Sequence, residues 1–227
     1  MTNHWIDIGN SDAILIIGSN VAETHPIAVK WIAKAQERGA PVIHVDPRFT
    51  RTSAKADIHC ALRPGTDIAF MGGLIRYAIE HDLVNREYVA AYTNGPYLVH
   101  PKFEFKDGLF SGFNEASQRY DQTTWAFQRG PDGQPLADLA PQHPECVFQQ
   151  LKRHYARYTP EMVAAVTGIP KETFLKAARA FCATGAPGKA GTILYAMGTT
   201  HHSVGSQNVR SHTILQLLLG NMGLAGG

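Results

Sequence analysis

The feature that most constrains the fold is a βαβ pattern between Asp12 and Arg48. An unbroken apolar run, Ala13–Ile17, stops at Gly18, which is typical of a strand covered on both faces of a parallel sheet. A helical pattern then runs from Pro26 to Arg38, and a second predicted strand follows from Pro41 to Val45. Two strands joined by a helix in this way predict a parallel pair.

Two further strands are predicted, Ile58–Leu62 and Thr192–Met197. Helical periodicity follows them at Ile68–His81 and Gly205–Leu219. We therefore expect an α/β fold with a mainly parallel, Rossmann-like sheet flanked by helices. In such a sheet ligands bind beyond the carboxyl ends of the strands, so the four loops that follow the strands should face one crevice.

The segment between Thr93 and Pro144 has a different composition, rich in aromatic, glycine, proline and polar residues. A long connection without regular elements is usually functional or disordered, and its aromatic density argues against disorder. Either it packs on another surface or it holds a small core of its own. We expect a nucleotide-binding part at 1–92, an insertion at 93–144 packing on the same domain, and helices with a fourth strand at 145–227, incomplete at the C-terminus.

Composition and charge narrow the classes of function. With 227 residues, 44% of them hydrophobic, the chain can bury a core, and its net charge of +2 does not indicate a nucleic-acid partner. No apolar run approaches the roughly 20 residues of a membrane span. The first residues lack the basic and apolar regions of a signal peptide, so a chain made alone is expected to stay in the cytoplasm.

The three cysteines, Cys60, Cys146 and Cys182, are far apart and form no Cys-x-x-Cys pair. An iron–sulfur cluster or zinc site built from this chain alone is therefore not expected. We expect each cysteine to be a small buried residue, and most of the eleven histidines to lie at the surface or in caps. The sequence thus offers no metal ligand.

The loops after the strands have the chemistry of a nucleotide site. Backbone N–H groups beside Gly18 and Gly198 can approach a phosphate, helped by the positive ends of the helices that follow. Asp46, at the end of the second strand, is placed to accept hydrogen bonds from ribose hydroxyls or a guanine edge. Neither Gly-x-Gly-x-x-Gly nor Gly-Lys-Ser/Thr occurs, which disfavours ordinary NAD and P-loop sites.

Each of these loops also has a purely structural interpretation. The Asp46-Pro47-Arg48 segment is compatible with an Asx turn. His201 and His202 are compatible with either a structural role or acid–base chemistry near neutral pH. Glu23 and His25 are compatible with capping the helix that follows them.

In order and spacing, these motifs resemble the molybdopterin oxidoreductase family. The segments that carry the resemblance are Gly18–Pro26, Val45–Arg48, Arg63–Ala69, Tyr158–Glu161 and Gly220–Gly223. Within the family, the catalytic alpha subunit of respiratory formate dehydrogenases is the more similar subgroup, and the aromatic segment resembles its insertion. The segments similar to that subgroup are Arg48–Thr52, Asn85–Tyr88, Ala91–Asn94, Asp107–Phe110 and His202–Gly205.

The resemblance implies a bis(molybdopterin guanine dinucleotide) cofactor with molybdenum or tungsten, at which the intact enzyme oxidises formate to carbon dioxide. Electrons would pass through iron–sulfur clusters to a beta subunit. By position, the resemblance assigns residues to a guanine dinucleotide arm, to the guanosine, to phosphate or ribose, and to a loop near the pterin and metal. The dinucleotide arm would contact Gly18, Ser19, Asn20, Glu23 and His25, and the guanosine would contact Asp46, Pro47, Arg48 and Thr50. Phosphate or ribose would contact Gly65, Thr66 and Asp67, and the loop near the pterin and metal would contain Met197, Gly198, Thr200 and His201.

The resemblance also implies that parts of the site lie outside this sequence. The family's cysteine or selenocysteine ligand and its iron–sulfur segment would precede Met1, and an arginine that helps to hold formate would follow Gly227. We therefore expect an internal fragment with no catalytic residue or metal ligand of its own, in which Thr200 and His201 lie nearest the metal. A selenocysteine codon read as a stop would explain a gene start at Met1.

The implied partners are the rest of the alpha subunit, an iron–sulfur beta subunit, a membrane cytochrome subunit and formate. The intact enzyme would serve anaerobic respiration at the periplasmic side of a membrane. Two alternatives stay open. The isolated chain is a catalytically inactive cofactor- or nucleotide-binding module, or it belongs to another molybdopterin oxidoreductase such as a nitrate reductase.

Overall fold

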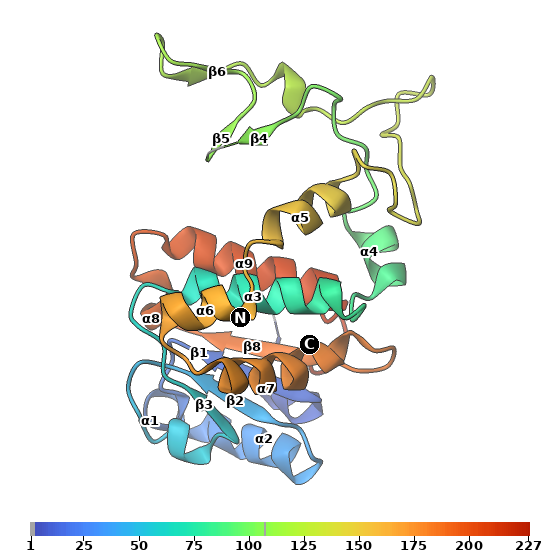
Figure 1. Cartoon of the computed structure of the whole chain (residues 1–227). Coiled ribbons are helices and arrows are strands. Elements are labelled where there is room, and N and C mark those ends of the chain that lie inside the picture. The colour runs from blue at the N-terminus through green and yellow to red at the C-terminus, as the bar shows by residue number, and fades with distance from the viewer. Residues whose placement is uncertain (1–2, 107) are drawn as a thin grey trace. The chain divides into compact units, whose positions relative to one another are not determined.

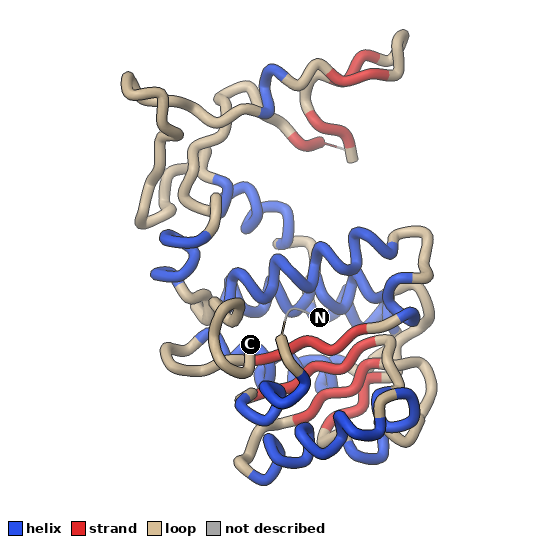
Figure 2. Tube along the Cα trace, turned by 180° about the vertical axis from the view of Figure 1, so that it is seen from behind, coloured by secondary structure: helices blue, strands red, loops and turns tan. Residues whose placement is uncertain are grey.

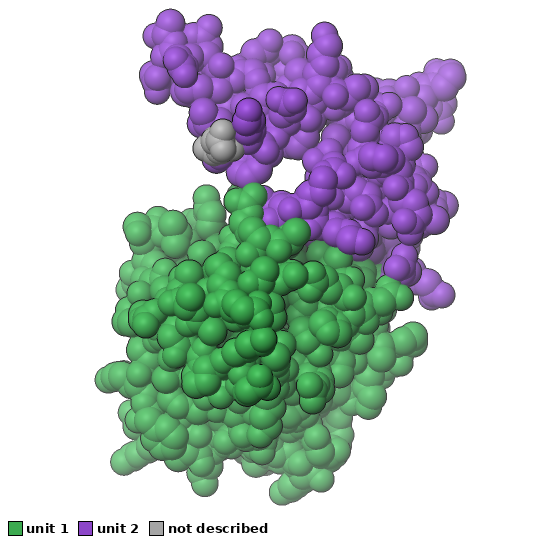
Figure 3. All heavy atoms as spheres, viewed as in Figure 1, with its two compact units in different colours: residues 1–85, 155–227 green, residues 86–154 purple. Residues whose placement is uncertain are grey.

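The structure is a computed structural model that describes residues 3–106 and 108–227. They form two compact units (Figure 3). Unit 1 comprises residues 1–85 and 155–227, and unit 2 comprises residues 86–154. Asp107, the first residue of one segment that carries the family resemblance, lies outside the described residues.

Unit 1 is built on a four-stranded parallel sheet in the order β3-β2-β1-β8 (Figure 1). Its strands are β1 (Ala13–Ile17), β2 (Val42–Val45), β3 (Ile58–Cys60) and β8 (Gly191–Tyr195). All five residues of β1 are buried, as expected for a strand with a neighbour on each side and helices on both faces. The predicted α/β fold with a mainly parallel sheet is confirmed.

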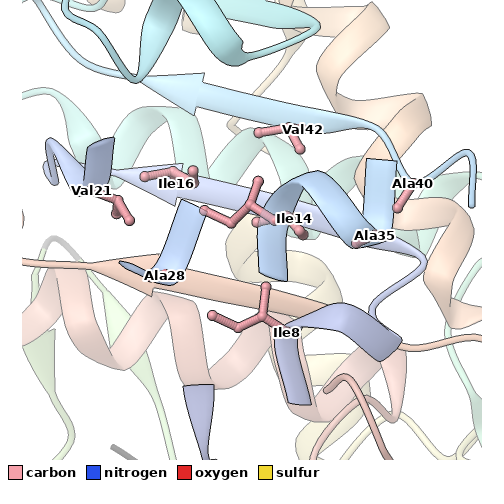
Figure 4. Close-up of a cluster of buried hydrophobic side chains, with 9 residues drawn as sticks. Ile8, Ile14, Ile16, Val21, Ala28, Ala35, Ala40 and Val42 are labelled. Carbon is pink, nitrogen blue, oxygen red and sulfur yellow. The ribbon is translucent and has the colours of Figure 1, made fainter. Parts of the chain in front are cut away.

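Helices cover both faces of this sheet (Figures 1 and 2). On one face, Ile14 and Ile16 of β1 pack with Ala28, Ile32 and Ala35 of α2 (Figure 4). On the other side, α7 contacts β1 and β3, while α3 packs on α6, α7 and α9. The helices of unit 1 are α1 (Val21–Thr24), α2 (Pro26–Glu37), α3 (Asp67–Glu80), α6 (Pro160–Thr167), α7 (Lys171–Cys182), α8 (Met197–Thr200) and α9 (Gly205–Leu219), with short 3-10 turns η1 (Trp5–Asn10), η2 (Ser53–Lys55) and η4 (Ala183–Gly185).

The element bounds agree with the sequence pattern except near two strand ends. Strand β3 stops at Cys60 and β8 stops at Tyr195, both two residues earlier than expected. After β8 the chain folds at once into the one-turn helix α8, so Met197 belongs to that helix and not to the sheet. All three cysteines are buried and free, as predicted.

Unit 2 contains two short hairpins between helices α4 and α5. Its elements are α4 (Arg86–Tyr92), β4 (Phe105–Lys106), β5 (Leu109–Phe110), β6 (Phe113–Asn114), β7 (Arg119–Tyr120), η3 (Thr123–Trp125) and α5 (Val147–Tyr155), the last of which ends at the boundary with unit 1. Phe110 lies with its ring centroid 4.9 Å from that of Phe105 and 5.2 Å from that of Trp125, and Tyr120 is 5.2 Å from Trp125. The aromatic residues thus contact one another. The expected packing of the insertion on the nucleotide-binding part stays a prediction.

Among the described residues, no helix is both long and apolar enough to cross a membrane.

Helix α9 carries a buried histidine, His212, that lies against β8. Its ring centroid is 5.3 Å from that of Tyr195, and neither ring nitrogen has a hydrogen-bond partner among the described residues. Burial disfavours the charged imidazolium and lowers the pKa of His212 from 6.5 to about 4. The folded chain therefore keeps this histidine neutral at pH values where the unfolded chain protonates it.

We expect the free energy of unfolding to fall as the pH is lowered from 6.5 to about 4, because only the unfolded chain binds a proton at His212 in this range. Above pH 6.5 His212 is neutral in both the folded and the unfolded chain, so the free energy of unfolding is not reduced by proton binding at His212. The full reduction between pH 6.5 and about 4 is on the order of 3 kcal/mol. Urea unfolding at several pH values measures it. His212→Phe should show a shallower pH dependence than the wild type. An equally steep dependence in the variant would contradict the assignment.

Candidate functional site

The loops after β1, β2, β3 and β8 meet at one edge of the sheet, as the parallel topology requires. A pocket of about 290 Å³ lies there, and we call it the four-loop pocket. Residues from all four loops line it, including Gly18, Asp46, Pro47, Arg48, Leu62, Pro64, Asp67, Met197, Gly198, His201 and His202. This convergence agrees with the single crevice that the sequence pattern predicts.

A second pocket, of about 780 Å³, lies beside the carboxyl end of β8, and we call it the β8 groove. Its lining includes Trp5, Ser19, Val21, His25, Tyr195, Met197 and Thr200. The rings of Trp5 and His25 stack with their centroids 5.1 Å apart. Met197 lines both pockets, so the two are neighbours at the same sheet edge.

The predicted site residues are thus divided between two pockets and the loops that support them. The four-loop pocket receives Gly18, Asp46, Pro47, Arg48, Asp67, Met197, Gly198 and His201, and the β8 groove receives Ser19, His25, Met197 and Thr200. Neither of these two pockets is lined by Asn20, Glu23, Thr50, Gly65 or Thr66.

Three of those remaining residues, Asn20, Glu23 and Thr66, make hydrogen bonds within or between loops. The Asn20 side-chain amide donates to Glu23 at 2.8 Å, and its oxygen accepts from the Thr52 hydroxyl at 2.9 Å. The Thr66 hydroxyl donates to the Arg63 carbonyl at 2.7 Å. His25 precedes α2, but its side chain makes no capping hydrogen bond to that helix. The capping interpretation of Glu23 and His25 is therefore replaced by an Asn20–Glu23 hydrogen bond and a Trp5–His25 stack.

The Asp46 side chain forms part of a turn and also lines the four-loop pocket. One of its carboxylate oxygens accepts from the Arg48 N–H at 2.9 Å, which is an Asx turn. The side chain also lines the four-loop pocket. Because a carboxylate has acceptor capacity for several hydrogen bonds, the turn leaves Asp46 able to accept from a ligand.

Asp67 is the most buried carboxyl group of the four-loop pocket, with 3% of the residue exposed. Desolvation raises its pKa above the usual value. His202 Nε2 lies 3.7 Å from Asp67 Oδ2, close enough for a protonated imidazole to offset the carboxylate charge. The resemblance assigned no cofactor contact to His202, although His202 begins one of the segments that carry the resemblance and was a candidate for acid–base chemistry.

The β1 and β8 loops touch through glycine. A Cβ atom on Gly18 would lie 2.5 Å from Thr199 N, and Gly18 has φ +58°. The Gly198 N–H donates to the Gly18 carbonyl at 3.0 Å, and the Gly18 N–H donates to Val45 O at 3.1 Å. These two amides are therefore used by the fold and are not free for phosphate.

A one-turn helix precedes each of the long helices expected after these glycines: α1 comes before α2, and α8 comes before α9. Both α1 and α8 have only four residues, so each contributes little helix dipole. Among the described residues, α3, with 14 residues, is a long helix that starts at this edge of the sheet. The two glycines set the distance between the β1 and β8 loops.

We expect Gly18→Ala to lower the free energy of unfolding by more than about 2 kcal/mol, because the new methyl group meets the Thr199 backbone and the residue keeps a positive φ. Gly188→Ala is the matched control: Gly188 has φ +76°, and an added Cβ would meet no other atom within 4 Å, so only the φ penalty of about 1 kcal/mol applies. Urea unfolding of both variants compares them. Equal losses would show that the close approach is unimportant.

Among the described residues, no group of three or more histidine, cysteine or acidic side chains is placed to hold a metal ion.

Comparison with known proteins identifies the family. The family model described as molybdopterin oxidoreductase matches residues 1–227. The chain belongs to the molybdopterin oxidoreductase family. Membership confirms the resemblance found in the sequence and implies a molybdopterin cofactor with a metal.

Several relatives are formate dehydrogenase subunits. The chain is 55% identical over 227 residues to formate dehydrogenase 2 subunit alpha (cytochrome c-553) of Nitratidesulfovibrio vulgaris and 53% identical to formate dehydrogenase subunit alpha of Megalodesulfovibrio gigas. It is 47% identical to the nitrate-inducible formate dehydrogenase major subunit of Escherichia coli. All of the chain is covered in each comparison, but it spans only 22% of each relative's length.

Among solved structures, acetylene hydratase from Pelobacter acetylenicus matches with a TM-score of 0.64. The match covers 96% of this chain and 25% of that one, at 21% sequence identity. At this identity the similarity supports the fold alone, and it agrees with the parallel sheet described above.

Proposed function

We propose that this chain is the guanine-dinucleotide-binding part of a formate dehydrogenase alpha subunit. In the intact protein, formate would be oxidised to carbon dioxide at molybdenum or tungsten held by bis(molybdopterin guanine dinucleotide). The observation that carries the proposal is the similarity to formate dehydrogenase alpha subunits across the whole chain, at 55% and 53% identity.

The side chains of the four-loop pocket fit the guanine nucleotide part of this cofactor. Guanine presents N–H donors on its edge and ribose presents hydroxyls, and the carboxylates of Asp46 and Asp67 accept hydrogen bonds. The diphosphate is anionic, and Arg48, His201 and His202 supply cationic or donor groups on the same pocket wall. Acceptors and cations together match a guanine nucleotide better than an apolar ligand.

The β8 groove gives the remaining predicted residues a role. Ser19, His25, Met197 and Thr200 line it, and we assign the Met197–His201 segment to the side of the site that faces the pterin and metal. When bound, the metal centre supplies the two-electron chemistry. The residues of this chain bind and orient the cofactor. The resemblance assigns Asn20, Glu23, Thr50, Gly65 and Thr66 to the guanine dinucleotide as well, and hydrogen bonds of Asn20, Glu23 and Thr66 also hold their loops.

The rest of the proposal concerns the longer protein. Its metal ligand, iron–sulfur segment and substrate arginine would be supplied outside this sequence. An iron–sulfur beta subunit and a membrane cytochrome subunit would accept the electrons, at the periplasmic side of the membrane. Within this chain, residues 1–92 and 145–227 would form the cofactor wall, with the insertion at 93–144 packed on it.

Guanine recognition is testable on the 227-residue chain. We expect GDP to bind more tightly than ADP in isothermal titration calorimetry, because carboxylates accept from the guanine edge. Asp67→Asn should weaken GDP binding about tenfold, since an amide is a weaker acceptor than a carboxylate. Asp132→Asn is the control, because Asp132 is an exposed residue of unit 2 whose carboxylate accepts from the Gln134 N–H. Equal affinity for ADP and GDP, or no binding, would contradict guanine recognition.

The reaction is tested separately, on the protein extended to the length of its relatives. We expect formate-dependent reduction of a viologen dye, together with bound molybdenum or tungsten. Activity with nitrate in place of formate would favour the nitrate reductase alternative. Guanine nucleotide binding without metal or formate activity would leave the inactive binding module as the function.

A further inference from the structure

A buried histidine, His44, lies on β2 directly before the loop that carries Asp46 and Arg48. Its exposed fraction is 0%, and the other residues of β2 are the apolar Val42, Ile43 and Val45. A polar ring in the middle of a buried strand is costly unless its nitrogens are hydrogen-bonded. Its contacts therefore show what this ring does in the fold.

Both ring nitrogens of His44 have partners, and the partners belong to different loops. Nε2 lies 3.2 Å from the Ser19 carbonyl oxygen, in the loop after β1. Nδ1 lies 2.8 Å from Ser53 Oγ, in the loop after β2. The ring thus spans the two loops that supply Gly18 and Asp46 to the four-loop pocket.

The direction of each hydrogen bond follows from the chemistry of the partners. A carbonyl oxygen only accepts, so Nε2 carries the hydrogen and donates to Ser19. In the neutral ring Nδ1 is then an acceptor, and the Ser53 hydroxyl donates to it. Ser53 Oγ in turn accepts from the Thr50 N–H at 2.9 Å. Ser53 Oγ also lies 3.4 Å from the Arg48 carbonyl oxygen, and the hydroxyl hydrogen is assigned to the shorter contact with Nδ1.

The charged and titratable neighbours of His44 are consistent with a neutral ring. His59 stacks on it with a centroid distance of 5.8 Å, and its Nε2 donates to the Asp46 carbonyl at 3.1 Å. Burial is the largest influence and lowers the pKa of His44, opposed by the Asp46 carboxylate and the Ser19 hydrogen bond. His59 thus binds the Asp46 backbone, and His44 binds Ser19 and Ser53 in the two neighbouring loops.

We propose that His44 is a positioning residue of the four-loop pocket: it fixes the Arg48–Ser53 loop against the Ser19 turn and thereby sets the affinity for guanine nucleotide. This inference rests on the proposed function, in which the pocket binds the guanine nucleotide part of the cofactor. A second link joins the same loops, because Thr52 Oγ1 accepts from the Ala22 N–H at 3.0 Å and donates to Asn20. Loss of His44 should therefore loosen the pocket without detaching the loops.

Three variants separate positioning from general stability. His44→Val keeps a strand-forming apolar residue and removes both hydrogen bonds, and we expect GDP to bind about tenfold more weakly. His44→Gln keeps an amide donor within reach of Ser19 and should recover part of that loss. His212→Leu removes a different buried histidine, one outside the four-loop pocket, and should leave the GDP affinity unchanged. Calorimetry gives the affinities, and circular dichroism verifies that each variant is folded.

A spectroscopic measurement tests the same inference without relying on a variant. Nitrogen-15 chemical shifts of His44 in the wild type should show the tautomer with hydrogen on Nε2 at pH 7. The opposite tautomer would overturn the proposal about His44. A folded His44→Val variant that binds GDP as tightly as the wild type would overturn it too. Either result would leave the proposed function standing. If the wild type binds no GDP, the proposed function fails and the inference fails with it.

Discussion

Parallel pairing of β1 with β2 on one side and β8 on the other is the constraint on which the site depends. In a parallel sheet every strand ends at the same edge, so loops that are far apart in sequence are brought together there. The Gly198 N–H to Gly18 carbonyl hydrogen bond then joins the outer loop to the central one. The pocket follows from this pairing and from the absence of a side chain at both glycines.

Sequence periodicity was sufficient for the parts of the fold that depend on one strong local signal. Strand β1 and helix α9 have the predicted bounds, because an unbroken apolar run and an uninterrupted helical stripe leave few alternatives. The predicted end of β8 was two residues too late, because Met197 is apolar enough to continue a strand but belongs to α8. No local pattern reports that turn, which depends on contact between Gly198 and the β1 loop.

The candidate site shows the same limit at the level of single residues. Strand ends located Asp46 and Asp67, since parallel topology alone brings them to one edge. His44 gave no signal, because a histidine inside an apolar strand looks like an interruption until its partners Ser19 and Ser53 are known. The glycines show a related limit: a glycine permits close approach, but the sequence does not say whether a ligand or another loop approaches, and here the Gly198 N–H donates to the Gly18 carbonyl.

The insertion of unit 2 between α3 and α6 has a consequence for synthesis of the protein. Strands β1, β2 and β3 are complete by Cys60, whereas β8 begins at Gly191. At translation rates of about 5–20 residues per second, the edge of β1 that β8 will occupy is without its partner for on the order of ten seconds. An unpaired strand edge invites pairing with other chains, so the growing polypeptide passes through an aggregation-prone stage. The same topology that builds the pocket therefore leaves one edge of β1 unpaired until synthesis has passed Gly191.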